Sequence, residues 1–417
     1  MFTVQRIGEI ISQLSTLRYP LQIPFSGWRM QHCTSDKRPT PDNNSGNWTE
    51  LPANGIWGGH FEYYAFETEI HLPDSMIGKT VEFTLLTGRE AEWDATNPQF
   101  SVYVDGVLRQ GFDVNHNDIR LTNSASDGET HSLFLSAFTG TSNFHLSFQT
   151  TLRTVDYAIE KLYFDLLIPW QTVSLLAPDH PEYLAWLPVL THTINLLYLR
   201  KPCSAAFYQS IREADQYREE ALYSKHHNAE ATIACVGHTH IDIAWLWTLA
   251  VTQDKAVRSF STVLELMGQY PEYVFMSSQP QLYQYVKRNA PEIYAQIKKR
   301  VSEGRWEPEG GSFVEPDCNL SSGEALVRQI LYGKRFFRQE FDKDCRILWL
   351  PDVFGYAAAL PQILKKSGID YFMTTKISWN ECNKMPYDTF YWKGIDGTKI
   401  LTHFVSTRDY ISAGNTN

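Results

Sequence analysis

Two side chains of the kind that bind metal ions stand in alternation at His240 and Asp242, directly after an apolar run at 231–236. The apolar run predicts a buried strand. Because alternate side chains of a strand point to one side, His240 and Asp242 can converge on one point beyond its carboxyl end. Imidazole and carboxylate together suit a divalent cation. The alternative is a strand end with hydrogen-bonded histidines, so the metal-site prediction depends on further segments.

A third candidate ligand is Asp352, which follows the almost wholly apolar run at 346–350. A carboxylate in this position is either a helix cap or a functional group. If it faces His240 and Asp242 across the strand ends, the three side chains form a shell for zinc or another divalent ion. A carboxylate there can also attack the anomeric carbon of a sugar.

Other polar segments are less specific. The loop at 306–320 carries Glu307, Glu309, Glu315 and Asp317, but each of these carboxylates can equally be solvated or cap the helix that follows. Two polar-aromatic clusters, at 93–100 and 113–116, could hold a carbohydrate. We favour the alternative for both clusters, namely that they are loops packing on the next domain.

The elements that must position these residues alternate between apolar strands and amphipathic helices from residue 231 onward. The expected strands lie at 273–276, 346–350, 371–374 and 400–404, and the expected helices at 254–267, 282–302, 323–341 and 360–367. This alternation is typical of a mainly parallel sheet or barrel, in which the ligand site lies at the carboxyl ends of the strands.

The part of the chain before residue 231 shows a different pattern of apolar and polar residues. An amphipathic helix is expected at 4–17, and short alternating strands follow from 61 to about 169, with a hairpin at Asp105-Gly106 and closing strands at 145–148 and 162–166. This pattern predicts an antiparallel β-sandwich of the jelly-roll kind. Helical periodicity at 182–225 predicts two or three connecting helices.

Composition limits the class of protein. The chain has 417 residues, a formal net charge of −10, and 12 Trp, 22 Tyr and 23 Phe. The acidic balance argues against nucleic-acid and anionic-membrane partners. No signal-peptide pattern or long apolar run is found, so we expect a cytoplasmic protein. The six scattered cysteines indicate neither a disulfide framework nor a thiolate zinc site.

Four stretches together carry a family resemblance, and they lie at 237–247, 306–319, 350–355 and 375–380. The first stretch reads Gly-His-Thr-His-Ile-Asp-Ile-Ala-Trp-Leu-Trp, and the second is the carboxylate-rich loop. The third reads Leu-Pro-Asp-Val-Phe-Gly and the fourth Thr-Lys-Ile-Ser-Trp-Asn. Together they resemble glycoside hydrolase family 38, the α-mannosidases. The pieces at 97–99 and 113–116 resemble the N-terminal β-domain of its cytosolic and bacterial branch. The resemblance implies a (β/α)7 barrel, a helical bundle, further β-domains and retaining hydrolysis of α-mannosides.

The resemblance also implies roles for individual residues. His240 and Asp242 match two metal ligands, and Asp352 matches the residue that is both third ligand and nucleophile. Zinc is the expected ion, with calcium as the alternative. His238 does not match a ligand and is expected to support the site by hydrogen bonding.

Substrate contacts are implied for four further residues. Trp245 matches the aromatic side chain that stacks on the bound mannose, Phe354 and Lys376 match positions lining the same subsite, and Asp317 is placed nearby. The expected partners are an oligosaccharide substrate and, as an option, a second copy of the chain in a homodimer.

The expected domains are an N-terminal helix and extended segment (1–55), a β-sandwich (56–172), a helical connector (173–228) and an incomplete α/β barrel (229–417). The family's acid/base residue and fourth ligand belong to motifs that this sequence lacks, so we expect the chain to be the N-terminal part of a longer enzyme. Two other functions stay open: a metal-dependent carbohydrate deacetylase and a non-catalytic carbohydrate-binding remnant.

Overall fold

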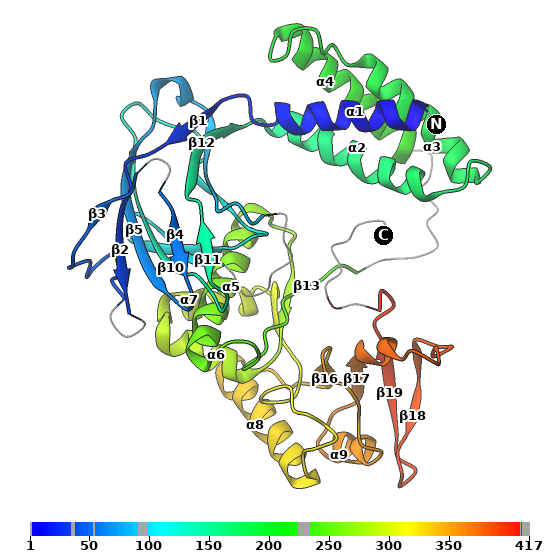
Figure 1. Cartoon of the computed structure of the whole chain (residues 1–417). Coiled ribbons are helices and arrows are strands. Elements are labelled where there is room, and N and C mark those ends of the chain that lie inside the picture. Colours follow the sequence, from blue (N-terminus) through cyan, green and yellow to red (C-terminus); the bar gives the residue numbers. More distant parts are fainter. Residues whose placement is uncertain are drawn as a thin grey trace.

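The chain folds into three groups of elements, namely a β-sandwich, a set of long helices and an α/β region (Figure 1). The computed structural model describes residues 2–34, 38–52, 55–90, 98–223, 234–408 and 410. Within these residues, no helix is both long and apolar enough to cross a membrane.

The sandwich consists of a four-stranded sheet in the order β1-β12-β6-β9 and a six-stranded sheet in the order β3-β2-β5-β10-β7-β8, with all described pairs antiparallel. A short pair, β4 with β11, completes it. The strands are β1 (Gln22–Phe25), β2 (Arg29–Cys33), β3 (Thr49–Glu50), β4 (Trp57–Gly59), β5 (Tyr63–His71), β6 (Thr80–Leu86), β7 (Gln99–Val104), β8 (Val107–Phe112), β9 (Asp118–Thr122), β10 (Thr130–Phe138), β11 (Phe144–Leu146) and β12 (Gln149–Val155).

The inner faces of the two sheets share one apolar core. Phe83 of β6 and Ile119 of β9 pack in the same cluster as Phe66 of β5 and Phe100 of β7. Alternate residues of β9 are buried, because a strand sends every second side chain inward. The predicted antiparallel sandwich and the Asp105-Gly106 hairpin are confirmed, whereas the jelly-roll connectivity stays a prediction.

The helical group joins segments that are far apart in the sequence. It consists of α1 (Phe2–Leu17), α2 (Tyr157–Leu175), α3 (Pro181–Leu196), α4 (Ala205–Arg218) and a π-helical turn at Glu219–Tyr223. Ile11, Leu162, Leu190 and Phe207 belong to its core, and α1 lies along α2 (Figure 1).

One predicted strand is wrong. Residues 162–166 lie inside α2, whose first turn is capped by the Asp156 carboxylate through the backbone N–H groups of Ala158 and Ile159. Ile159, Leu162, Leu166 and Val173 are buried at helical spacing. The aromatic and apolar residues between them produced a false strand pattern.

The α/β region supplies the parallel strands β13 (Gly237–His238), β14 (Phe275–Ser277), β15 (Trp306–Pro308), β16 (Ile347–Leu350), β17 (Tyr371–Thr374) and β19 (Lys399–Phe404), with β18 (Thr389–Lys393) added antiparallel at the edge. Its helices are α5 (Leu249–Gln269), α6 (Pro280–Asn289), α7 (Pro291–Ser302), α8 (Gly323–Phe341) and α9 (Leu360–Lys366).

Two sheets of this region meet through a single parallel bridge between Gly310 and Leu348, which sets β15 next to β16. Over the described residues the strands form an open arrangement and do not close into a barrel, so the predicted (β/α)7 barrel stays unconfirmed.

Most predicted elements of the α/β region are present, with four differences. The expected helix at 282–302 is two helices, because Pro291 begins α7 directly after α6. The loop at 306–320 starts with β15, and β18 was not predicted. The first strand was expected at 231–236, of which 231–233 lie outside the described residues. Residues 234–236 are not in a strand, and β13 begins only at Gly237. The domain limits at residues 56, 173 and 229 stay predictions.

Candidate active site

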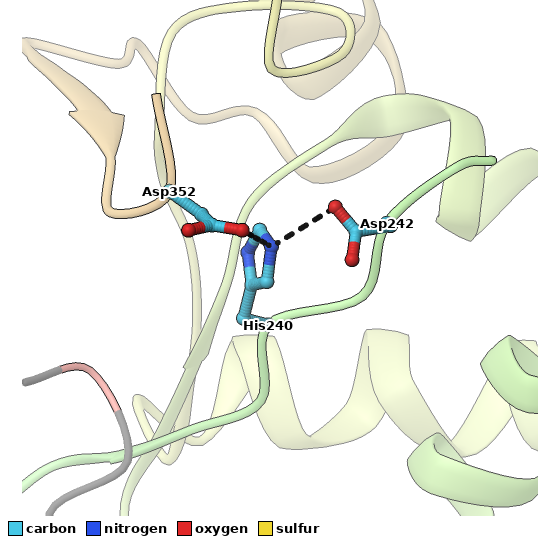
Figure 2. A group of neighbouring side chains, drawn as sticks. All are labelled: His240, Asp242 and Asp352. Atoms are coloured by element: carbon cyan, nitrogen blue, oxygen red, sulfur yellow. Dashed lines mark hydrogen bonds and ion pairs between the residues drawn. The ribbon is translucent and has the colours of Figure 1, made fainter. Parts of the chain in front are cut away.

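The candidate site lies where β13 and β16 end. His240 and Asp242 follow β13, and Asp352 follows β16. Because β13, β14 and β15 are parallel and a parallel bridge joins the β15 segment to β16, the carboxyl ends of these strands lie at one edge. Figure 2 shows the three side chains pointing toward one another from two separate segments.

The distances place these three side chains around one point. Nε2 of His240 lies 3.3 Å from Oδ1 of Asp242 and 3.4 Å from Oδ2 of Asp352. One ligand-type atom from each residue lies within 4.8 Å of the other two. The His240 side chain is 8% exposed and that of Asp352 is 15% exposed. The structure therefore brings together the three predicted metal-ligating residues.

The pKa values of His240 and Asp352 are shifted by burial and by the charged groups beside them. Burial by itself lowers the pKa of His240, but the contacts of its ring with the carboxylates of Asp242, Asp352 and Glu315 outweigh that effect and raise the pKa to about 12. Burial raises the pKa of Asp352, but its contacts with His240 and Lys376 outweigh this and hold the pKa below its usual value. Asp352 is therefore ionised at neutral pH.

Lys376 supplies a buried positive charge beside Asp352. Its Nζ lies 2.6 Å from Oδ1 of Asp352, and its side chain is only 2% exposed. The same Nζ lies over three aromatic rings, 3.4 Å from the centroid of Trp379, 4.8 Å from that of Tyr410 and 5.0 Å from that of Phe354. Lys376 thus lies beside Asp352, and its contact with Phe354 places that ring next to it, whereas the predicted role of both residues in a sugar subsite stays a prediction.

Exposed aromatic rings surround the polar group. Phe354 packs edge-on against Trp379 with 5.5 Å between ring centroids, and both rings are mostly exposed. Trp245, three residues after Asp242, packs edge-on against Trp247 and is 51% exposed. Exposed rings of this kind can stack on the apolar face of a sugar. The stacking role of Trp245 stays a prediction.

Two predicted residues have local hydrogen-bonding roles. Oδ1 of Asp317 accepts the backbone N–H groups of Asn319 and Leu320 at 2.8 and 2.7 Å, which stabilises the turn before α8. Its substrate contact stays a prediction. Nδ1 of His238 lies 3.2 Å from the Met276 carbonyl, and its Nε2 lies 3.4 Å from the indole nitrogen of Trp349.

His238 is therefore engaged on both sides of its ring, in line with the supporting role expected for it. Burial lowers the pKa of His238 to about 4, so this imidazole is neutral at physiological pH. As a neutral ring it donates to the Met276 carbonyl through Nδ1 and accepts from Trp349 through Nε2.

Three neighbours of the site were not assigned from the sequence. Glu315 lies 3.4 Å from Nδ1 of His240, the Tyr410 ring lies 5.1 Å from the His240 ring, and Trp379 contacts Lys376. No sequence signal separated Glu315 from the other carboxylates of its segment, because Glu307 also lies between an apolar residue and a proline and yet is exposed. No sequence signal pointed to Tyr410.

The second cluster that could hold a carbohydrate makes local hydrogen bonds. Oδ1 of Asp113 accepts the backbone N–H groups of Asn115 and His116. The end of the preceding strand lies on α5, where the Gly111 N–H donates to Oγ1 of Thr262. The favoured interpretation of the 113–116 segment, a loop packing on the next domain, stays a prediction. In the other cluster, 93–97 lie outside the described residues.

The donor set around His240 fits a divalent cation. An imidazole nitrogen and two carboxylates are ligands that zinc accepts, whereas calcium prefers oxygen donors throughout. The group also holds more carboxylates than cations, since Asp242, Glu315 and Asp352 gather around His240 and Lys376. A bound dication would balance this surplus.

A cavity of about 210 Å³ opens at the carboxyl ends of β17 and β19. Thr375, Asn380 and Asp388 are among its lining residues, whereas His240, Asp242, Asp352 and Lys376 are not.

Comparison with known proteins gives consistent results. Residues 230–417 match the model of the glycosyl hydrolases family 38 N-terminal domain. The chain is 45% identical to "Alpha-mannosidase G" of Dictyostelium discoideum over 211 residues, which cover 50% of this chain and 19% of that protein. It is 47% identical to "Alpha-mannosidase 2C1" of Homo sapiens over 187 residues, which cover 45% of this chain and 18% of that protein.

A solved α-mannosidase from Enterococcus faecalis V583 is 22% identical to this chain, with a TM-score of 0.36, and the match covers 41% of this chain and 20% of that one. The chain thus spans about a fifth of the length of the curated relatives it matches.

Proposed function

Since residues 230–417 belong to glycosyl hydrolases family 38, we propose that the chain forms the nucleophile-bearing part of an α-mannosidase. The enzyme would hydrolyse terminal α-linked mannose from oligosaccharides, with retention of configuration. The observation that carries this proposal is the convergence of His240, Asp242 and Asp352 within 4.8 Å at the strand ends.

His240, Asp242 and Asp352 would hold one divalent ion, with zinc as the expected metal. When bound, the ion would supply a fixed positive charge that orients the sugar hydroxyls and stabilises charge in the transition state. Asp352 and Asp242 would present their oxygens to it from opposite sides of the His240 ring, as Figure 2 illustrates.

Asp352 is the proposed nucleophile. Its carboxylate is ionised, since contacts with His240 and Lys376 hold the pKa low. One oxygen would form a bond to the anomeric carbon while the bond from that carbon to the leaving oxygen breaks, and water would later hydrolyse the glycosyl-enzyme ester. Lys376 would fix the orientation of this carboxylate through Oδ1.

Aromatic side chains would position the sugar. Trp245 and Phe354 are both exposed, so their faces are free to stack on a mannose ring. Asp317 would contact the substrate from the turn before α8. The second carboxyl of a retaining pair stands about 5 to 5.5 Å from the nucleophile. We assign this acid/base role to neither Asp242 nor Glu315, because both contact His240.

A substrate with a strongly activated leaving group tests the nucleophile separately from acid catalysis. 2,4-Dinitrophenyl α-mannoside releases its phenolate without protonation, so the zinc-loaded chain should give a burst of about one equivalent. Mass spectrometry should then find one hexosyl unit on the peptide containing Asp352. The Asp352→Asn variant should give neither signal.

The matched control is Asp344→Asn, which removes an exposed carboxylate paired with Lys334 and Arg338. This variant should retain the burst. No burst and no labelled peptide from the wild-type chain would contradict the proposal. Release of acetate from an N-acetyl sugar without phenolate release would favour the deacetylase alternative. A cytoplasmic location and a homodimer are further proposals, to be checked by fractionation and by sedimentation.

A further inference from the structure

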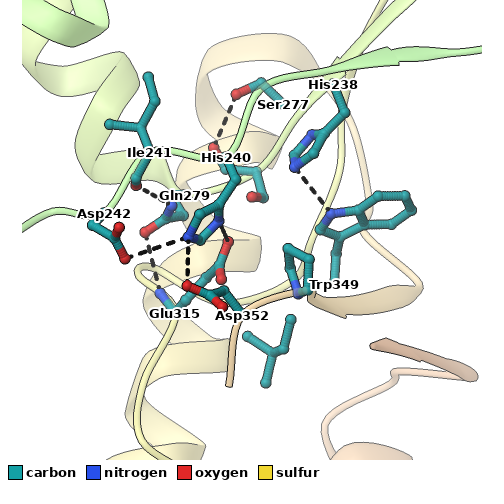
Figure 3. Close-up of polar contacts among 12 residues, drawn as sticks. His238, His240, Ile241, Asp242, Ser277, Gln279, Glu315, Trp349 and Asp352 are labelled. Carbon is teal, nitrogen blue, oxygen red and sulfur yellow. Dashed lines mark hydrogen bonds and ion pairs between the residues drawn. The ribbon is translucent and has the colours of Figure 1, made fainter. Parts of the chain in front are cut away.

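We propose that Glu315 is a positioning residue that accepts the Nδ1–H of His240 and thereby aims Nε2 at the point between Asp242 and Asp352. The proposal deepens the function proposed above and rests on it, since it concerns how the chain prepares its metal ligand. Figure 3 shows Glu315 on the side of the His240 ring opposite to Asp242.

The two nitrogens of His240 face different groups. Nδ1 lies 3.4 Å from Oε1 of Glu315, whereas Nε2 lies 3.3 Å from Asp242 and 3.4 Å from Asp352. To bind a metal ion, the imidazole must give up the proton on the binding nitrogen and keep only one proton, and a hydrogen bond to the other nitrogen decides where that proton stays. An acceptor at Nδ1 therefore leaves the lone pair on Nε2, which faces the two other ligands.

The burial of Glu315 calls for an explanation. Its side chain is 8% exposed, and among the described residues neither carboxylate oxygen has a standard hydrogen bond. Nδ1 of His240 is the ion-pair partner of this carboxylate. Burying a carboxylate costs free energy unless it is paired, and an apolar side chain would fill the same space without this cost. A structural role alone does not account for a carboxylate here.

Gln279 connects the loop that carries Glu315 to the loop that carries His240. Oε1 of Gln279 accepts the backbone N–H of Glu315 at 3.3 Å, and Nε2 of Gln279 donates to the Ile241 carbonyl at 2.9 Å. One buried amide thus connects the residue after His240 to the backbone of Glu315 (Figure 3).

The backbone at Gln279 supports a specific role. This residue has φ of +63° directly before Pro280, which begins α6. A left-handed conformation at a residue other than glycine carries a cost, and such residues cluster at functional sites. Here the conformation directs the side chain to both loops. The backbone of Glu315 is therefore held at a fixed place relative to the backbone next to His240.

Zinc binding to the whole chain tests the proposal, measured by isothermal titration calorimetry with zinc ion as the probe. Glu315→Leu removes the acceptor and should weaken zinc binding about 10- to 100-fold. Glu315→Gln keeps an acceptor oxygen and should weaken it less than about 10-fold. Glu307→Gln, an exposed carboxylate in the same loop, is the matched control and should bind as the wild type does.

Two further readouts separate positioning from a structural role. Thermal unfolding of the metal-free Glu315→Leu variant should occur at or above the wild-type temperature, because a buried charge is removed. In the cobalt-loaded wild type, NMR should detect a shifted exchangeable proton from His240 Nδ1–H. That signal should persist in Glu315→Gln and be lost in Glu315→Leu.

The outcomes distinguish this proposal from the function on which it rests. If the wild-type chain binds zinc and the folded Glu315→Leu variant binds it equally tightly, the positioning role is wrong while the metal site stands. If Glu315→Leu and Glu315→Gln lose the same affinity, charge rather than orientation is responsible, and the positioning role is also wrong. If the wild-type chain binds neither zinc nor cobalt, both proposals are wrong.

Discussion

Two of the described polar clusters in which a histidine lies beside an aspartate differ in how their charges are balanced. At the strand ends, three carboxylates surround His240 and one buried lysine. In the loop after β8, Asp113 is matched by His116 and by backbone N–H groups. The first cluster has a surplus of buried negative charge, whereas the second is satisfied within its own loop.

This contrast distinguishes a ligand site from a packing site. A surplus of buried carboxylates costs free energy unless a cation offsets it, so it indicates a bound ligand. The β8 segment instead lies on α5, where Arg109 binds Glu265 through two hydrogen bonds of 2.9 Å. Side chains there already have partners within the fold. Variants of the two clusters should therefore affect different properties.

The largest effect is expected from His240→Ala, which removes the central side chain of the first cluster. Zinc affinity should fall more than about 100-fold, because a direct ligand contributes more than a residue acting through it. Calorimetric titration of the whole chain checks this. The matched variant His116→Ala should bind zinc as the wild type does, and a similar loss in both variants would contradict the distinction.

The next effect concerns stability. A Cβ on Gly111 would lie 1.7 Å from Cγ of Arg258 on α5, so Gly111→Ala should lower the free energy of unfolding by about 1–3 kcal/mol through overpacking. Urea denaturation measures it.

The control for this variant is Gly268→Ala, also in the α5 region, where a Cβ meets nothing within 4 Å. It should leave stability unchanged or raise it by about 0.5–1 kcal/mol. Zinc affinity should stay the same in both variants. A loss of zinc affinity in Gly111→Ala would mean that the two clusters are coupled.

A smaller effect is expected from Arg109→Met. The change removes the bidentate ion pair with Glu265, in which both side chains are partly exposed. It should lower the free energy of unfolding by about 1 kcal/mol. A double-mutant cycle with Glu265→Gln isolates the interaction. A coupling energy near zero would show that this ion pair does not hold β8 on α5.

The smallest effect depends on pH. The hydrogen bond to Asp113 raises the pKa of His116 above its usual value, despite the opposing effect of burial. A raised pKa in the folded state means that stability is fully present below about pH 6.5 and is lost as pH rises through the folded pKa. His116→Gln should therefore lower stability by about 0.5 kcal/mol near pH 6, since the ring is half exposed.

That difference should decrease from pH 6 to pH 9, as the pH rises through the folded pKa and the ring loses its proton in the folded state too. Parallel urea titrations at the two pH values check it. A stability difference that is constant across pH would show that His116 contributes by packing rather than by charge.

Much of the α/β region could be predicted because its patterns are local. The helix at 323–341 was predicted with both ends correct: Ser322 caps the backbone N–H of Ala325, and the chain turns left-handed at Asp342. By contrast, residues 162–166 were read as a strand, because the alternation of aromatic and apolar residues over a short window fits either period. Burial over the whole of α2 decides between them.

The candidate site was only partly predictable for a similar reason. His240, Asp242 and Asp352 lie at strand ends, and parallel pairing brings such ends together. Glu315 comes from a loop rich in carboxylates, so its sequence does not distinguish it from Glu307 or Asp317. Only the tertiary structure, in which Oε1 of Glu315 lies 3.4 Å from Nδ1 of His240, shows that Glu315 points inward.

The sequence by itself determined the types of side chain available to the site and the strands that carry them, because ligand chemistry and strand periodicity are properties of short segments. The tertiary structure decided which carboxylates surround His240 and which are matched elsewhere. That outcome depends on burial and on the parallel order of β13, β14 and β15, with the segment after β15 bridged to β16. Burial makes an unmatched charge costly only after the loops have come together.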